Sequence, residues 1–362
     1  MTHPLLTVLR VPPDELPQAP GSFDGGELVR AAERHGLSGL VMRALENVPL
    51  TPALSQRERE VLRKHALAIA ATGMKLRRLL FQALDALGEE GITPVLLKGY
   101  GFASRYWPEP LLRPCSDVDL LVDEHELPAA TRVAMKLGLT RHDDPGEDDP
   151  FAHHHHLGFH GPAGLLELHF RPIAGFGSAM ERARTVEGTL EGRKVRYLTP
   201  EDELVYLGAH AAQHCFLRLG WLVDLKFLLG RPLNEQRVVE LAQEVGMSGA
   251  VFAALTALQT ALHFPVPWRL MDGLSPSRWR NILVAAAFTE ERLVSASLAQ
   301  KKLPAFAVRT LLADSLPNMA RHSAEGALRA LRRAMSARHG KHRARFLRGE
   351  KKTWHHPKSP RL

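Results

Sequence analysis

The sequence has little cysteine: only Cys115 and Cys215 occur among its 362 residues. Two cysteines cannot build a disulfide-stabilised scaffold, and they make a reducing compartment the default expectation. The N-terminal residues also lack the basic head and apolar segment of a secretory signal. We therefore expect a cytoplasmic protein.

Long apolar runs are scarce as well. The stretch 246–268 contains no Asp, Glu, Lys or Arg, but Pro265 and Pro267 interrupt it near its end. Its helical part is shorter than the roughly 20 residues that cross a bilayer. We interpret this stretch as a buried helix and expect no membrane partner.

Acidic residues are nearly missing from the C-terminal end, and this absence accounts for the net charge of +8. Residues 321–362 hold 13 Lys or Arg against Glu325 and Glu350, a net of +11, so residues 1–320 carry −3. The basic character therefore belongs to the tail and does not indicate a nucleic-acid-binding body. The tail could contact nucleic acid through charge alone, although a solvated tail is the commoner explanation.

At about 100–200 residues per domain, the chain is long enough for two or three packed units. Apolar periodicity predicts an α+β fold, in which a small mixed sheet lies between helical layers. The predicted units are a loosely ordered lead-in (1–25), an N-terminal helical layer (26–91), an α/β core (92–200), a helical C-terminal domain (201–339) and a basic mobile tail (340–362).

Helical spacing and breakers predict the following helices: 26–47, 55–90, 99–107, 124–137, 200–217, 219–229, 234–245, 248–263, 277–299 and 305–335. Short apolar runs bounded by turn residues predict strands at 93–98, 118–122, 155–160, 165–170 and 195–198.

The most informative segment is Asp117-Val118-Asp119-Leu120-Leu121-Val122. In a strand, Asp117 and Asp119 point to one face while Val118 and Leu120 point to the other. Two adjacent carboxylates repel each other unless a cation or hydrogen-bond donors stabilise them. Oxygen ligands favour Mg²⁺ or Mn²⁺. The alternative is that Asp117 caps a turn and Asp119 is merely exposed.

Glu167 interrupts the apolar strand LeuLeuGluLeuHisPhe, and His169 shares its face. A buried carboxylate without a partner costs several kcal/mol, so Glu167 is expected to hold a metal together with Asp117 and Asp119. The alternative for Glu167 is a salt bridge to Arg113 or Arg171. His169 is a candidate residue of the substrate pocket, and a structural histidine is an equally good interpretation.

Lys98-Gly99 ends one predicted strand and opens the next helix, where an ammonium and free backbone N–H groups suit a polyphosphate. A solvated lysine at a strand end is the commoner occurrence. Arg113 precedes the acidic pair and would either neutralise phosphate charge or pair with Asp117.

Histidines gather in two places. His153–His156, with His142 and His160 nearby, form a histidine-rich patch, in which alternation along a strand lets at most two of the run share one metal. His210 and His214 are four residues apart on a predicted helix, a spacing that can bind zinc. We interpret that pair as part of a substrate pocket, which Trp221 and Asp224 on the following helix could complete.

Taken in order, LeuLysGly (97–99), Arg113, SerAspValAspLeuLeuVal (116–122) and GluLeuHis (167–169) resemble the uncharacterised bacterial nucleotidyltransferase family, which belongs to the superfamily with the DNA polymerase β-type nucleotidyltransferase fold. The resemblance covers about residues 25–300. It implies that Asp117, Asp119 and Glu167 are the metal-binding triad. The usual Gly-Ser pair of the superfamily is replaced here by Lys98-Gly99-Tyr100-Gly101.

The function expected from the residues and the resemblance is Mg²⁺-dependent transfer of a nucleoside monophosphate from an NTP, ATP above all, to an acceptor hydroxyl, with release of pyrophosphate. Glu167 would also help to deprotonate that hydroxyl, and Lys98, Gly99 and Arg113 would bind phosphates. Two alternatives stay open: a catalytically inactive binding or regulatory protein of the same fold, and a metallohydrolase that uses the histidine-rich patches.

Overall fold

The computed structural model describes residues 3–10, 24–45, 54–141, 155–300 and 302–328. Its helices are α1 (Pro4–Arg10), α2 (Gly25–His35), α3 (Ser38–Leu45), α4 (Gln56–Glu89), α5 (Gly99–Tyr106), α6 (Leu127–Lys136), α8 (Pro200–Gln213), α9 (Gly220–Leu229), α10 (Glu235–Glu244), α11 (Ser248–Leu262), α12 (Trp268–Leu274), α13 (Arg278–Ala287), α14 (Glu290–Ser295), α15 (Ser297–Gln300) and α16 (Lys302–Leu311). Residues 316–328 are also helical.

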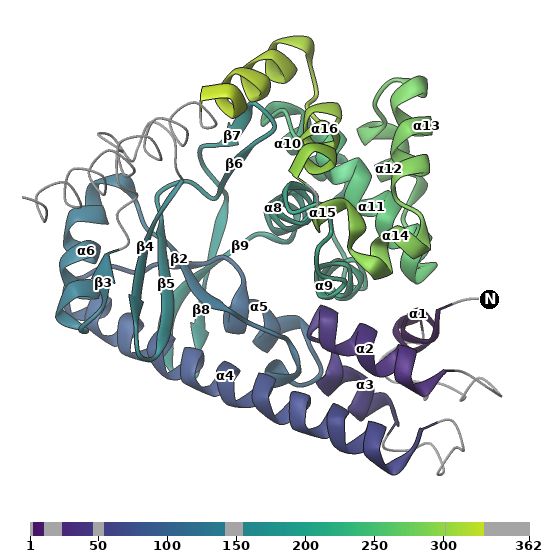
Figure 1. Ribbon diagram of the computed structural model, residues 1–362. Coiled ribbons are helices and arrows are strands. Elements are labelled where there is room, and N and C mark those ends of the chain that lie inside the picture. The colour runs from purple at the N-terminus through teal and green to yellow at the C-terminus, as the bar shows by residue number, and fades with distance from the viewer. Residues whose placement is uncertain (1–2, 11–23, 46–53, 142–154, 301, 329–362) are drawn as a thin grey trace, which may run out of the picture.

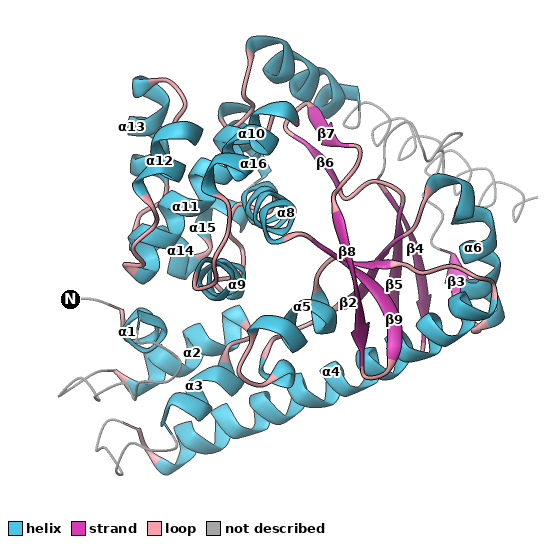
Figure 2. Cartoon of the chain, turned by 180° about the vertical axis from the view of Figure 1, so that it is seen from behind, coloured by secondary structure: helices cyan, strands magenta, loops and turns pink. Residues whose placement is uncertain are grey.

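The strands are β1 (Val95–Leu96), β2 (Asp117–Leu121), β3 (Thr140–Arg141), β4 (His156–Gly161), β5 (Gly164–His169), β6 (Ile173–Gly175), β7 (Ser178–Met180), β8 (Thr185–Leu190) and β9 (Arg193–Leu198). Seven of them form one sheet in the order β3-β4-β5-β2-β1-β9-β8, and β6 pairs with β7 (Figure 2). The pairs β2–β5 and β1–β9 are parallel and the others antiparallel, so the predicted α+β fold with a mixed sheet is confirmed.

Helix α4 is the longest element and runs beneath the sheet and the N-terminal helices (Figure 1). Its start is fixed by a capping box, in which the Glu58 N–H donates to the Ser55 hydroxyl and the Ser55 N–H donates to the Glu58 carboxylate. Its C-terminal half buries Leu76, Leu80 and Leu84 in one core with the sheet and α6. This packing covers one face of the sheet.

The opposite face of the sheet is turned toward α8 and the C-terminal helices (Figures 1 and 2). Val95 of β1, Leu121 of β2 and Leu198 of β9 share a second core with α8, α9, α11 and the N-terminal helices α1–α3. Residues that point away from α4 therefore enter the space between the sheet and α8.

The prediction of a loosely ordered lead-in is wrong for residues 4–10. They form α1, which buries Leu5, Leu6, Val8 and Leu9 in the second core. Burial of four apolar side chains within seven residues stabilises this helix, although Pro and Gly are frequent in residues 11–25. The predicted mobile tail, 340–362, lies outside the described residues.

Several predicted helices are divided. The segment 26–47 breaks at Gly36, whose φ of 69° ends α2. The segment 277–299 breaks at Phe288 and restarts where the Thr289 hydroxyl accepts the Arg292 N–H at the start of α14. Strands β3, β6, β7 and β8 and helix α12 were not predicted, because short or half-exposed segments carry a weak periodic signal. None of the described helices is long and apolar enough to cross a membrane.

Candidate active site

Asp117, Asp119 and Glu167 form a carboxylate cluster where β2 and β5 run side by side. Parallel pairing places Asp119 opposite Glu167 and Leu121 opposite His169. Ligand atoms of Asp119, Glu167 and His169 lie within 4.8 Å of one another. Glu167 is 48 residues from Asp119 in sequence, yet the strand register brings both carboxylates to one face of the sheet.

The alternation of β2 explains this orientation. Val118 and Leu120 are buried in the core beneath the sheet with α4 and α6, so Asp117 and Asp119 point to the other side. Asp119 is only 3% exposed. The sequence prediction that the two aspartates share a face agrees with this arrangement.

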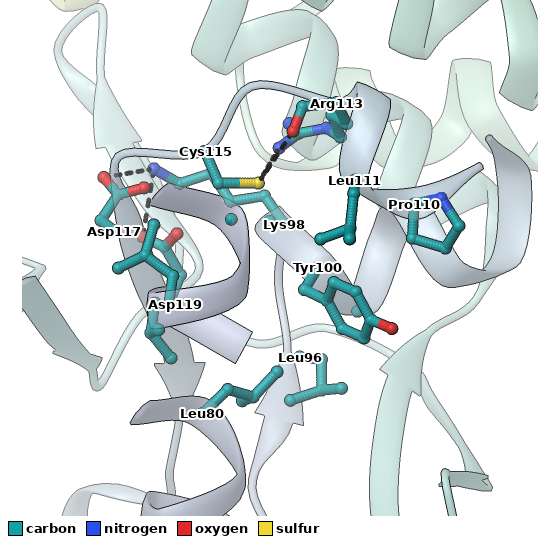
Figure 3. Close-up of a pocket in the computed structure, with 15 residues that line it drawn as sticks. Leu80, Leu96, Lys98, Tyr100, Pro110, Leu111, Arg113, Cys115, Asp117 and Asp119 are labelled. Atoms are coloured by element: carbon teal, nitrogen blue, oxygen red, sulfur yellow. Dashed lines mark hydrogen bonds and ion pairs between the residues drawn. The ribbon is translucent and has the colours of Figure 1, made fainter. Parts of the chain in front are cut away.

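Lys98 joins the two aspartates. Its ammonium lies 3.3 Å from Asp117 Oδ2 and 3.1 Å from Asp119 Oδ1 (Figure 3). Lys98 is the N-cap residue of α5, and Gly99 after it has a φ of 68°, which glycine adopts without strain. This turn directs the lysine side chain back to the start of β2.

The charges of the cluster are strongly coupled. Burial alone would lower the pKa of Lys98, but Asp119, Asp117 and Glu167 raise that pKa above its usual range. Burial would raise the pKa of Glu167, whereas the hydrogen bond from His169 and the charges of His156 and Lys98 lower it to about 2. Glu167 is therefore ionised at neutral pH, which suits a metal ligand better than a proton acceptor.

His169 lies beside both carboxylates and is itself buried. Its Nε2 is 3.1 Å from Asp119 Oδ1 and 3.4 Å from Glu167 Oε2. Burial would lower the pKa of His169, but hydrogen bonds to these two carboxylates raise it. The second oxygen of Asp119, Oδ2, is buried and has no hydrogen-bond partner among the described residues.

Arg113 does not join the carboxylate cluster. Its guanidinium lies 2.7 Å from Asp224 Oδ2, and Asp224 Oδ1 also accepts the indole N–H of Trp107 at 2.7 Å. The alternative in which Arg113 pairs with Asp117 is wrong, because α9 presents Asp224 to it. The alternative salt bridge of Glu167 to Arg113 or Arg171 is also wrong: Glu167 contacts histidines, and Arg171 pairs with Glu181.

Helix α8 and its C-cap residue place three side chains on one face at a spacing of four residues: Tyr206, His210 and His214. The rings of His210 and His214 are 4.7 Å apart, and Trp221 of α9 lies 5.1 Å from the first and 5.4 Å from the second. Burial is the main cause that lowers the pKa of His210 far below its usual value and that of His214 to about 4. Both imidazoles are neutral at pH 7.

Sequence reasoning missed Tyr206, which is fully enclosed and interacts electrostatically with Lys98 and Asp119. A signal was present, since Tyr206 lies one helical turn before His210 and hence on the same face of α8. It was overlooked because a tyrosine in an apolar helix is usually a core residue.

Two hollows adjoin the cluster. A narrow crevice is lined by Lys98, Gly99, Asp117 and Asp119 (Figure 3). A wider cavity of about 420 Å³ lies between the N-terminal helices and α9, and it shares Arg113 and Cys115 with the crevice. Its other lining residues are Glu33, Gly36, Ser38, His65, Ala68, Ile69, Pro114, Ser116, Arg218, Gly220, Trp221 and Asp224.

Comparison with known proteins gives three findings. No curated protein matches the chain. Among solved structures, the chain is similar to the antibiotic-resistance factor ANT(2'')-Ia, with 15% identity, coverage of 46% of this chain and 89% of that chain, and a TM-score of 0.36. A likeness of this size supports no statement about function. The family model of the uncharacterised nucleotidyltransferases matches residues 21–263, which are two thirds of the chain and include the whole carboxylate cluster. The protein therefore belongs to this nucleotidyltransferase family.

Proposed function

We propose that the protein transfers a nucleoside monophosphate from an NTP to an acceptor hydroxyl and releases pyrophosphate, with Mg²⁺ or Mn²⁺ held by Asp117, Asp119 and Glu167. One observation carries the proposal: parallel strands place the Asp119 and Glu167 carboxylates opposite each other, with Asp117 on the same face. Family membership supplies the reaction class.

The donor set fits a hard divalent cation. Asp119 Oδ2 is buried and has no hydrogen-bond partner among the described residues, and such an atom is costly unless a cation or a donor reaches it. Carboxylate oxygens are the ligands that Mg²⁺ and Mn²⁺ prefer. A bound divalent cation would neutralise phosphate charge and stabilise the attacking and leaving oxygens.

The chain's own cations would position the triphosphate. Lys98 and the start of α5 face the crevice beside Asp117, where the N–H groups after Gly99 would bind phosphate oxygens. The Lys98 ammonium contacts Asp117 and Asp119, and it would turn to the phosphates once a divalent cation binds these two carboxylates. The buried Asp224 already neutralises Arg113, so we assign Arg113 to holding the crevice wall. Positioning and charge stabilisation suffice for this chemistry, which needs no nucleophilic side chain.

The 420 Å³ cavity is our candidate for the acceptor site. It opens beside Ser116, the residue before Asp117, and its wall combines an indole (Trp221), a carboxylate (Glu33) and a guanidinium (Arg218). A wall of this kind suits a small polar molecule with hydroxyl groups. His210 and His214 support Trp221 from behind, which is the role we propose for this pair.

The test is label transfer from α-³²P-labelled NTPs in the presence of Mg²⁺, with a panel of small hydroxyl compounds as acceptors. Asp119→Asn and Glu167→Gln should each lower the rate at least about 100-fold, a loss of roughly 3 kcal/mol of transition-state stabilisation. Glu187→Gln, an exposed carboxylate on β8, is the matched control and should leave the rate unchanged.

Two results would contradict the proposal. Equal label transfer by wild type and Asp119→Asn would remove this carboxylate from the mechanism. Binding of Mg²⁺ and ATP without transfer to any acceptor would instead favour an inactive binding protein of the same fold.

A further inference from the structure

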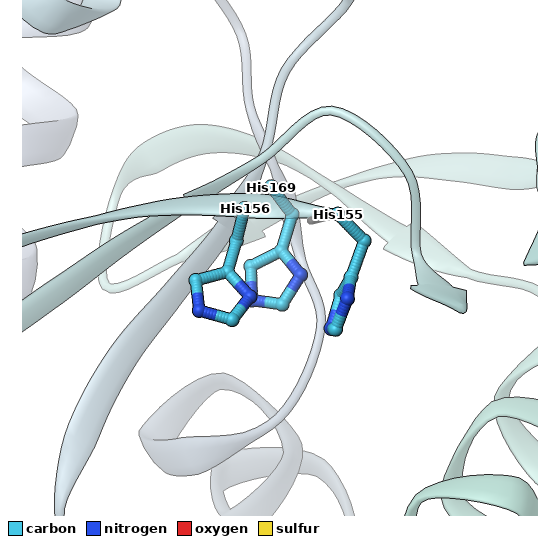
Figure 4. A group of neighbouring side chains, drawn as sticks. All are labelled: His155, His156 and His169. Atoms are coloured by element: carbon cyan, nitrogen blue, oxygen red, sulfur yellow. The ribbon is translucent and has the colours of Figure 1, made fainter. Parts of the chain in front are cut away.

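Three imidazoles converge at the open end of the β4–β5 hairpin, the end away from its turn. Ligand nitrogens of His155, His156 and His169 lie within 4.8 Å of one another. The ring centroids are 4.7 Å apart for His155 and His156, 5.4 Å for His155 and His169, and 5.0 Å for His156 and His169. Figure 4 shows the three rings grouped on the same side of the backbone.

Backbone pairing holds this group together. His156 of β4 is directly opposite His169 of β5, so their side chains share one face. His155 precedes β4, and its carbonyl accepts the backbone N–H groups of Phe170 at 3.0 Å and Arg171 at 3.3 Å. Because His155 lies outside the strand, strict alternation does not apply to it, and two consecutive histidines reach the same point.

The hydrogen bonds of His169 indicate which of its nitrogens is available. Its Nε2 faces Asp119 and Glu167, and its Nδ1 is buried with no hydrogen-bond partner among the described residues. Zinc-binding histidines commonly donate one ring N–H to a carboxylate, which fixes the tautomer and leaves the other nitrogen for the metal. His169 has this arrangement, with Asp119 as the carboxylate.

We propose that His155, His156 and His169 form a second metal site, selective for Zn²⁺ or a similar borderline cation, beside the carboxylate cluster. Nitrogen ligands favour Zn²⁺, Ni²⁺ and Cu²⁺ over Mg²⁺, whereas the neighbouring oxygen ligands have the opposite preference. Three histidines make a site with a fourth position left for water or Glu167. Tetrahedral zinc ligands lie about 3.4 Å apart, so modest side-chain rotations would close the site.

His169 links the two sites structurally, because its Nε2 bonds the Asp119 carboxylate while its Nδ1 would hold the second metal. A cation on its Nδ1 would clamp the start of β4 to the end of β5 and so fix the strand that carries Glu167. The inference concerns metal binding alone and holds whether or not the protein transfers nucleotides.

The experiment is equilibrium dialysis of the chelator-treated full chain against ZnCl₂ with excess MgCl₂, so that Mg²⁺ occupies the carboxylates. We expect one zinc per chain. His155→Ala and His169→Asn should each weaken binding at least tenfold, whereas Asp117→Asn and His160→Ala, an exposed histidine of the same hairpin, should not. Circular dichroism of each variant shows whether it is folded, and X-ray absorption of the zinc complex should give nitrogen neighbours at about 2.0–2.1 Å.

Any of the following results would overturn the proposal. If His169→Asn binds zinc as tightly as wild type, the histidine run binds zinc without the folded site. If Asp117→Asn loses zinc, the metal occupies the carboxylate cluster. If His160→Ala weakens binding as much as His155→Ala, or if no zinc binds in excess Mg²⁺, the three imidazoles do not form a selective site.

Discussion

The buried pair of Arg113 and Asp224 gives a prediction that can be worked through quantitatively. Their side chains are 6% and 1% exposed, and the Trp107 indole donates to the same carboxylate. Asp224→Leu removes the carboxylate that bonds both the Arg113 guanidinium and the Trp107 indole, and it leaves a buried guanidinium uncompensated. Breaking a buried ion pair in this way costs about 3–5 kcal/mol, and the orphaned indole N–H adds about 1 kcal/mol or more.

The assay is urea unfolding of four proteins: wild type, Asp224→Leu, Arg113→Met and the double variant. The double variant should lose much less stability than the sum of the two single losses, because neither charge is then left alone, and the coupling should be about 2–3 kcal/mol. The exposed pair of Lys136 and Glu90, 70% and 37% exposed, is the control, and Lys136→Met should cost less than about 1 kcal/mol.

Additive losses in this cycle would refute the reasoning, since they would mean that the two side chains do not stabilise each other. A loss below about 1 kcal/mol in Asp224→Leu would show that the guanidinium reaches water when its partner is removed.

Three further predictions concern other parts of the molecule. Burial lowers the pKa of His35 to about 4, so the stability that its neutral form contributes should be fully present above pH 6.5. The free energy of unfolding should then fall by up to about 3 kcal/mol as the pH drops toward 4. Urea unfolding at several pH values should show a flatter pH dependence for His35→Gln. Lys98→Met leaves Asp117 and Asp119 without their cation, so the melting temperature of the variant should fall. Mg²⁺ should raise the melting temperature of this variant more than that of wild type. An equal response to Mg²⁺ would argue against metal binding at these carboxylates. Gly249→Ala should lower the free energy of unfolding by about 1–3 kcal/mol, because its Cβ would lie 2.6 Å from the Leu312 carbonyl oxygen. Gly88→Ala in α4 meets nothing within 4 Å and should raise the free energy of unfolding by about 0.5–1 kcal/mol. Similar melting temperatures for the two variants would contradict this prediction.

Local patterns were enough to predict the elements that carry the carboxylates. The alternation of Val118 and Leu120 with the aspartates indicated both the strand and the face, and the capping residues of α4 are visible in sequence. Glu167 was chosen because a carboxylate in an apolar strand needs a partner. Its place opposite Asp119 depends on strand register, which the sequence does not state.

Contacts between distant segments could not be predicted in the same way. Asp224 is 111 residues from Arg113 in sequence, and although its place on the helix after His214 suggested a pocket residue, nothing local predicts its ion pair with Arg113. Strands β6 and β7, of three residues each, are too short for a periodic signal, and α1 was hidden by the prolines around it. The meeting of His155 with His169 depends on a bend before β4, which alternation along a strand does not predict.

The position of α4 has a practical consequence for dissecting the protein. The sheet rests on leucines of the second half of this helix, whereas α2 and α3 pack against its first half. A fragment trimmed to 92–200 would leave the underside of its sheet in contact with water and would aggregate. The smallest fragment worth expressing therefore begins before α4. Loss of activity in a fragment that begins after α4 would reflect misfolding and would not test the catalytic residues.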